Sequence, residues 1–340
     1  MQASVPPLHQ RATLIVGVML AFSIATLLFA GMTGSIRVPL HEIPDALRQL
    51  ASGQPDSLSA SLLELRASRA LVAFATGGAL ALAGLMMQAL LRNPLADPYV
   101  LGVSSGASVG ALLALLLSAS MLVVDAAALA GAIGVALLLY LLARRDLRSG
   151  QAAEGGASML LLTGVIVSAL CGSVVTLMLA IAPEGRLRSM IFWLIGDLAG
   201  APLRLVPWLV LAGCLLYAMR NARAMNMVAL HAENAVTLGV RVGALRKGLF
   251  FVSALLTASA VTSAGSIGFV GLVVPHACRF AFGPDHRVLI PAVALAGGAF
   301  LVLCDTLART IVAPQQLPVG AITAMIGAPV FLYQLHRLRK

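Results

Sequence analysis

The sequence predicts an all-α protein that crosses a membrane about ten times, and three observations support this prediction. Of the 340 residues, 60% are hydrophobic and only 11% are charged, whereas a soluble protein carries about 25% charged residues. Long apolar runs also follow one another with short polar breaks. Because about 20 apolar residues span a bilayer as a helix, such runs are typical of a multi-span membrane protein. The alternative, a soluble protein with several buried helices, does not explain the scarcity of charge.

Two apolar runs are too long for one span and have to fold back. The run from Tyr99 to Ala143 has Asp125 near its turn, and the run from Lys247 to Phe280 breaks at residues 263–266. We expect a single transmembrane domain over residues 1–340, whose first helix is retained because no small-residue cleavage site follows it closely. The expected helices lie near residues 12–34, 67–91, 99–118, 122–143, 157–181, 203–220, 247–264, 267–282, 288–309 and 317–336.

Positive charge is unevenly divided between the two sides of this bundle. The net charge is +10, but the basic residues are dispersed between spans, which disfavours nucleic-acid binding. With both termini in the cytoplasm, 15 of the 23 lysines and arginines fall on the cytoplasmic side and 8 on the other. Since cytoplasmic loops carry an excess of Lys and Arg, this orientation is favoured.

The expected spans contain almost no group that could couple transport to an ion gradient. Of 13 acidic residues, all but Asp305 lie in expected loops or at the ends of expected helices, whereas ion-driven transporters hold ionisable groups at membrane depth. The chain also lacks the G-x-x-x-x-G-K-[ST] loop that cradles ATP phosphates and any nucleophile–base pair of an intramembrane enzyme. If the protein pumps, its energy must come from a partner. An ion-coupled secondary transporter that acts alone stays the alternative.

No metal or cofactor site is expected on this chain. The four cysteines lie in or beside apolar runs without metal-ligand spacing and are interpreted as small buried hydrophobes; they are Cys171, Cys214, Cys278 and Cys304. His276, near a helix end beside Arg279, is interpreted as structural.

Small residues recur at helical spacing in two expected helices. They are Gly102, Gly106 and Gly110 in one, and Gly164, Ser168 and Gly172 in the other. Small residues let helix backbones approach closely in lipid, so the stripes predict either tight helix packing or helices that line a path.

The turn between the second and third expected helices is polar and stiff. It reads Arg-Asn-Pro-Leu-Ala-Asp-Pro over residues 92–98. Proline cannot continue a helix and pushes the preceding residue out of the α region, so we expect a short hairpin at the cytoplasmic face.

The longest expected cytoplasmic connection covers about residues 221–247 and is amphipathic rather than apolar. Asn234 to Gly239 predicts a short helix that ends at a glycine cap. The segment either lies on the membrane surface or docks a soluble ATPase.

Four strings of the chain resemble the FecCD-type permease family, the membrane subunits of type II ABC importers for ferric siderophores, haem and vitamin B12. They are GGALALAGLMMQALLRNPLADPYVLGVSSGAS, GSIGFVGLVVPHACRF, CDTLAR and LPVGAITAMIGAPVFLYQL, and the resemblance covers the chain from about residue 11 to its end. The resemblance implies ten helices, a homodimer or related pair around a two-fold axis, two ATPase subunits that hold ATP and Mg²⁺, and a periplasmic substrate-binding protein. It places the protein in the inner membrane and leaves the chelate open.

The resemblance also implies roles for individual positions. A cytoplasmic gate is expected at Asn93, Leu95, Ala157 and Ser158, although a threonine is expected where Ala157 stands. Docking of the binding protein is expected at Arg66, Arg69 and Arg309; the alternatives are lipid-headgroup anchoring for the first two and local pairing with Asp305 for Arg309. Contact with the ATPase is expected at Val228, Ala229, Leu230, His231, Glu233, Leu238, Gly239 and Val240, where His231-Ala232 departs from the family's Gly-Glu pair.

Overall fold

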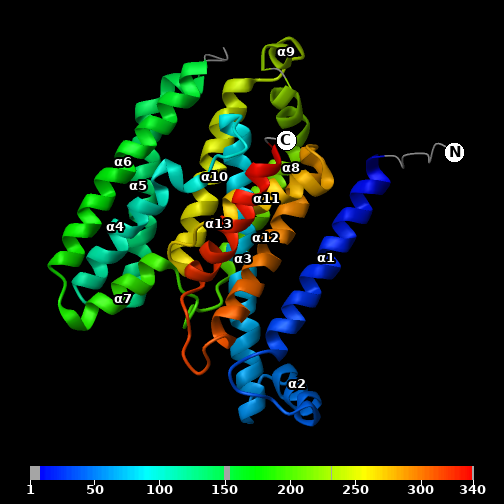
Figure 1. Cartoon of the computed structure of the whole chain (residues 1–340), viewed down its shortest axis with the longest axis vertical. Coiled ribbons are helices and arrows are strands. Elements are labelled where there is room, and N and C mark those ends of the chain that lie inside the picture. Colours follow the sequence, from blue (N-terminus) through cyan, green and yellow to red (C-terminus); the bar gives the residue numbers. More distant parts are fainter. Residues whose placement is uncertain (1–7, 149–153, 231, 339–340) are drawn as a thin grey trace.

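The computed structural model describes residues 8–148, 154–230 and 232–338, and all of its regular secondary structure is helical (Figure 1). Seven helices are long and apolar enough to cross a membrane, and three shorter apolar helices accompany them. The seven are α1 (Leu8–Met32), α3 (Leu58–Leu91), α5 (Met121–Arg148), α6 (Glu154–Ala180), α8 (Leu205–Leu230), α10 (Val242–Ala264) and α12 (His286–Thr310). The three shorter ones are α4 (Val103–Leu116), α11 (Val270–Phe282) and α13 (Val319–Leu338).

Short helices mark the two ends of the bundle. At one end lie α2 (Ile43–Ala51) and the 3-10 turn η1 (Leu40–Glu42), and at the other lies α9 (Ala232–Thr237). We call these the α2 end and the α9 end. Both described termini lie toward the α9 end in Figure 1, as ten alternating crossings require.

Helix α3 is the axis of the bundle, and glycines set its distance from its neighbours. Gly77 faces the backbone of Gly297 on α12, and Gly84 faces the backbone of Gly271 on α11; in both cases an added Cβ atom would overlap the facing carbonyl. On a third side, Ser253 of α10 donates a hydrogen bond to the carbonyl of Ala83 over 3.0 Å. Helices α11 and α12 therefore contact α3 backbone to backbone, and α10 contacts the α3 backbone through a side chain.

The glycine stripes that the sequence shows serve mainly as packing surfaces. A Cβ atom on Gly106 or Gly110 would overlap backbone atoms of α5 at Gly131 and Ala127. Gly102 faces the side chain of Ser168, and Gly164 faces the carbonyl of Val100. Gly172, in contrast, has open space around it.

The polar turn after α3 is built by its own side chains. Arg92 ends α3 in the left-handed conformation with a φ of 50°. The Asn93 side chain then accepts a hydrogen bond from the amide of Leu95 over 2.9 Å, and the Asp97 side chain accepts one from the amide of Tyr99 over 2.7 Å. Asp97 thereby caps the 3-10 turn η2 (Pro98–Leu101), which leads into α4 through Gly102 at a φ of 71°.

The structure corrects several predicted boundaries. Helix α3 begins at Leu58 rather than near 67, because Ser57 caps it by accepting a hydrogen bond from the amide of Ala60. Helix α8 does not end near 220 but continues to Leu230, so the first part of the predicted connection 221–247 belongs to a long helix. Helices α2 and α7 (Glu184–Ile195) were not predicted at all, because both are too short and too polar to stand out as spans.

Replacing Gly84 by alanine should destabilise the fold, because the new methyl group would overlap the backbone of Gly271. Overpacking typically costs about 1–3 kcal/mol. We expect a lower thermal unfolding midpoint for purified Gly84→Ala in detergent. The matched control is Gly172→Ala, which adds the same methyl group where nothing lies within 4 Å. Equal midpoints for the two variants would contradict the packing described here.

Candidate functional site

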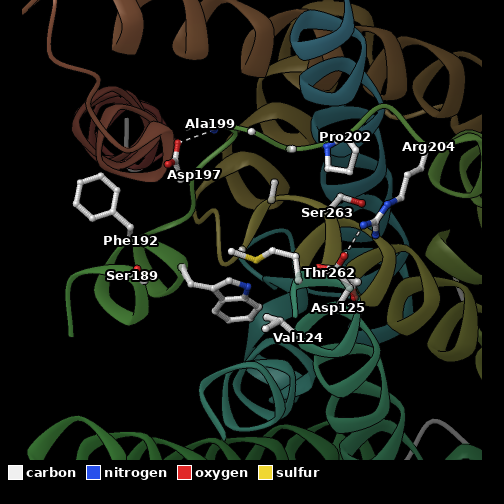
Figure 2. Close-up of a pocket in the computed structure, with 16 residues that line it drawn as sticks. Val124, Asp125, Ser189, Phe192, Asp197, Ala199, Pro202, Arg204, Thr262 and Ser263 are labelled. Carbon is white, nitrogen blue, oxygen red and sulfur yellow. Dashed lines mark hydrogen bonds and ion pairs between the residues drawn. The ribbon is translucent and has the colours of Figure 1, made fainter. Parts of the chain in front are cut away.

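Two cavities share a wall formed by residues 197–204. The first, of about 470 Å³, lies where α5 begins, α10 ends and α7 passes; we call it the aromatic cavity because Phe192 and Trp193 line it (Figure 2). The second, of about 410 Å³, lies at the α2 end, and we call it the arginine cavity. Gly200, Ala201 and Pro202 border both cavities.

The shared wall is held at both of its ends. At one end, the Asp197 amide donates to the carbonyl of Ala264 over 3.0 Å, and its side chain accepts from the amide of Ala199 over 2.9 Å. At the other end, Arg204 forms an ion pair with Asp125 of α5 at 2.5 Å, drawn as a dashed line in Figure 2. Between these anchors Gly200 has a φ of 72° and open space around it. The wall is thus fixed at its ends, and it has room for a side chain at Gly200.

The arginine cavity brings together all three arginines that the sequence predicted for docking. Arg66, Arg69 and Arg309 line it although they come from α3 and α12. Arg66 is buried and donates to the carbonyl of Met32 over 3.2 Å and to that of Ile36. This arginine therefore fixes the link that follows α1.

Asp305 lies beside the arginine cavity and pairs with two of the arginines that line it. Its side chain is only 1% exposed, and it lies 2.8 Å from Arg69 and 3.1 Å from Arg309. Arg69 reaches it through two nitrogens and also donates to Gln316 over 2.7 Å. The local Asp305–Arg309 pair that the sequence offered as an alternative is present, but Asp305 in addition ties α12 to α3. Three arginines line the cavity and only one carboxylate pairs with them, so the cavity attracts anionic groups.

The predicted gate residues lie on two segments that touch each other. Asn93 and Leu95 are in the turn after α3, and Leu95 is 43% exposed. Ala157 and Ser158 lie on α6, but their side chains fall outside the described part of the structure. The segments meet where η2 packs against α6, with the Val100 carbonyl beside Gly164.

Tyr99 joins this turn to the non-helical link between α10 and α11, a contact that the sequence analysis missed. Its hydroxyl donates to the carbonyl of Ile267 over 2.8 Å and accepts from the amide of the same residue over 3.0 Å. Ser104 and Ser266 add a hydrogen bond of 3.1 Å. The only sequence signal was a tyrosine and several serines within otherwise apolar runs.

The predicted ATPase-contact segment presents apolar side chains at the α9 end. Leu230, Val236 and Leu238 are 75%, 50% and 68% exposed. Helix α9 confirms the predicted short helix, which ends before Gly239 at a φ of 84°. Val228 is buried against the body, whereas Ala229 is exposed and Val240 is half-buried. His231 and the side chain of Glu233 fall outside the described residues.

His276 is packed in the interior and not exposed on the surface. It is buried, and its ring meets that of Phe331 edge-on at 6.2 Å. Arg279, one turn away, donates to the Gln88 side chain over 3.0 Å. Within the described ranges, no group of three His, Cys, Asp or Glu side chains could hold a metal ion.

The Asp97 cap is sensitive to pH because burial raises the pKa of its carboxyl from 3.8 to about 6, against the hydrogen bond from Tyr99, which lowers it. Folding therefore favours the protonated form. Ionisation of the Asp97 carboxyl destabilises the folded state. This effect is absent below the pKa that Asp97 has in the unfolded chain and is complete once the pH has risen above about 6.

We expect Asp97→Asn to stabilise the purified protein, because an asparagine keeps the cap and cannot ionise. The gain should be about 1–3 kcal/mol at pH 8 and much smaller at pH 4.5. Thermal unfolding of both proteins across this range measures it. The control Asp45→Asn removes a carboxylate from the exposed pair with Arg48. A difference between Asp97→Asn and wild type that does not grow with pH would contradict the effect of burial.

Comparisons with known proteins agree with this geometry. The model of the FecCD transport family matches residues 18–337. The cobalamin import system permease protein BtuC of Halobacterium salinarum is 42% identical over 292 residues, which cover 84% of this chain and 76% of the relative. The hemin transport system permease protein HmuU of Yersinia pestis is 39% identical over 287 residues, covering 82% of this chain and 84% of that protein.

A solved structure has the same fold. It is an inward-facing conformation assigned to a metal-chelate type ABC transporter, with a TM-score of 0.82 and 28% identity over 95% of this chain and 99% of its own. A family match over nearly the whole chain, two relatives well above 30% identity and a shared fold lead to one conclusion: the chain belongs to the FecCD transport family.

Proposed function

We propose that this chain is the transmembrane permease subunit of an ABC importer that moves a metal chelate into the cytoplasm, driven by a separate ATPase. The observation that carries the proposal is the family match together with relatives that import cobalamin and hemin. The cargo is accordingly a ferric siderophore, haem or cobalamin. In this arrangement the chain itself binds no cofactor, and ATP with Mg²⁺ belongs to the partner.

The two ends of the bundle suit different partners. We assign the α9 end, with both termini, to the cytoplasm, because its exposed leucines offer an apolar surface to an ATPase subunit. The α2 end then faces the periplasm, where the arginine cavity offers positive charge to acidic side chains of a substrate-binding protein. We propose that the protein lies in the inner membrane in this orientation.

A second copy of the chain is the partner that we propose within the membrane. Helices α6 and α13 present large apolar side chains outward, among them Leu162, Leu170, Met325 and Tyr333. The gate segments on α6 and the turn after α3 would then face their counterparts across a two-fold axis. Cargo would pass along that axis when both turns move apart.

The secondary-transporter alternative lacks a usable coupling group. Within the described spanning helices the buried carboxylate is Asp305, and two arginines hold it. The other buried carboxyl, Asp97, lies outside the spans in the turn after α3, where it caps η2. A carboxylate that already has two cationic partners is poorly suited to taking up and releasing a proton or Na⁺. The family relatives also fit the importer and not this alternative.

Reconstitution in liposomes tests the function. We expect the chain alone to accumulate no cargo, with or without a cation gradient, and the complex with its ATPase and loaded binding protein to accumulate it when ATP is present. Labelled cobalamin, haem and a ferric siderophore serve as cargo, and the complex with ATP omitted is the control. Gradient-driven accumulation by the chain alone would overturn the proposal.

Docking on the arginine cavity is tested with Arg69→Gln. This change removes one positive charge but leaves Asp305 paired with Arg309. We expect the Kd of the complex for its binding protein to rise about tenfold, equivalent to about 1.4 kcal/mol, with a weaker salt dependence than wild type. The control is Arg48→Gln on α2, where the arginine pairs with exposed Asp45. An unchanged Kd for Arg69→Gln at low salt would rule out docking at this cavity.

A further inference from the structure

A polar cluster at the α9 end joins two helices that the proposed function treats separately. It consists of Asn226 near the end of α8 and of Asp285, His286 and Arg287 where α12 begins. Asp285 is the N-cap of α12 and accepts a hydrogen bond from the Arg287 amide over 2.9 Å. The Arg287 guanidinium also pairs with it at 2.7 Å.

The chemistry of this cluster fixes how Asn226 is oriented. The backbone N–H of His286 can only donate, so the atom that faces it at 2.9 Å must be the amide oxygen, Oδ1. The amide nitrogen Nδ2 then donates to Oδ1 of Asp285 over 2.7 Å. His286 Nδ1, 2.7 Å from the same amide oxygen, must carry a proton. Both the oxygen and the nitrogen of the Asn226 amide therefore form hydrogen bonds with the first residues of α12 and its N-cap.

Asp285 is well suited to this contact because it stays ionised. Hydrogen bonds from the Arg287 side chain, and further ones from the Arg287 amide and Asn226, hold its pKa well below the usual range despite partial burial. A hydrogen bond to a charged acceptor is stronger than a neutral one. The contact between Asn226 and Asp285 is thus a charge-assisted hydrogen bond between two helices.

The helices joined here connect the two ends of the molecule. Four residues beyond Asn226, α8 ends at Leu230, and α9 with its exposed apolar side chains follows. Helix α12 continues without a break from His286 to Arg309, which lines the arginine cavity. Between these points α12 is pressed against α3 at Gly77 and Gly297. A movement of α12 at the α2 end would reach α8 through Asn226.

We infer that Asn226 is a positioning residue that couples the arginine cavity at the α2 end to the ATPase-contact segment at the α9 end, by fastening α8 to the first turn of α12. This inference rests on the proposed function. Asn226 contacts neither cargo nor nucleotide; it makes α8 follow α12.

The test compares coupling, not activity alone. The complete complex is reconstituted with its ATPase and loaded binding protein, and hydrolysis with and without binding protein is measured beside cargo moved per ATP. Asn226→Asp retains the shape of the side chain but places a second carboxylate against Asp285. We expect the stimulation of hydrolysis by binding protein, and the cargo moved per ATP, to fall at least fivefold. Asn226→Ala, which removes the amide without adding charge, should lower both in the same direction.

The matched control is Asn221→Ala. Asn221 lies on the same helix, and its side chain donates to the Tyr217 carbonyl of that helix over 2.9 Å. We expect wild-type stimulation and wild-type cargo per ATP. If Asn226→Asp and Asn226→Ala also retain wild-type coupling, the inference is wrong.

Hydrogen–deuterium exchange on the wild-type complex supplies a measurement that does not depend on a variant folding. On addition of loaded binding protein, amide exchange should change in residues 222–230 and 286–290 together. A change in only one of these segments, or in neither, overturns the inference. Failure of the proposed function is distinguishable, because the wild-type complex would then show no ATP-driven uptake at all.

Discussion

The architecture depends on the contact between α3 and α12, where two glycines let backbone meet backbone in the middle of the bundle. In lipid the hydrophobic effect contributes little to helix association, so close packing and polar contacts have to stabilise it. Gly77 and Gly297 supply the packing, and the Arg69–Asp305 ion pair supplies the polar contact toward the α2 end. Together they make the two helices one rigid unit that reaches both ends of the molecule.

This rigid unit places the functional segments relative to one another. At the α2 end, this unit carries the arginine cavity. At the α9 end, α3 leads into the Asn-Pro-Leu turn. At the same end, α12 contacts α8 through Asn226. Tyr99 also binds the Asn-Pro-Leu turn to the link between α10 and α11. Interfaces packed at backbone distance are not continuously deformable, so small shifts at one end are transmitted as movements of whole helices. Such a body suits a transporter whose energy source lies outside the membrane.

Hydropathy and spacing were sufficient to predict all ten apolar helices and the turn after α3, because these depend on local rules of span length and proline geometry. What they could not predict depends on distant partners. Nothing near Gly84 in the chain announces that Gly271 will face it, and the three arginines of one cavity were predicted only through a family resemblance. The extension of α8 to Leu230 was missed because residues 221–230 are polar enough to resemble a loop, although Ala222, Met225 and Val228 are buried in the body. The sequence around Asn226 did not predict its role, because its hydrogen-bond partners lie at the start of α12, about 60 residues further along the chain.

In the arginine cavity, the ion pairs of Asp305 serve the fold and also set how much positive charge is left over for the partner that we propose. An unpaired arginine inside a membrane protein is costly, so Asp305 has to be present for Arg69 and Arg309 to be held near the α2 end. A second carboxylate would leave less excess positive charge on the three arginines and would weaken their attraction for acids. With a single carboxylate, the cluster is stable enough to fold and still carries excess positive charge. On the function that we propose, the missing counter-charge is supplied by an acidic partner outside the chain, and docking of that partner would stabilise α3 and α12 in this region.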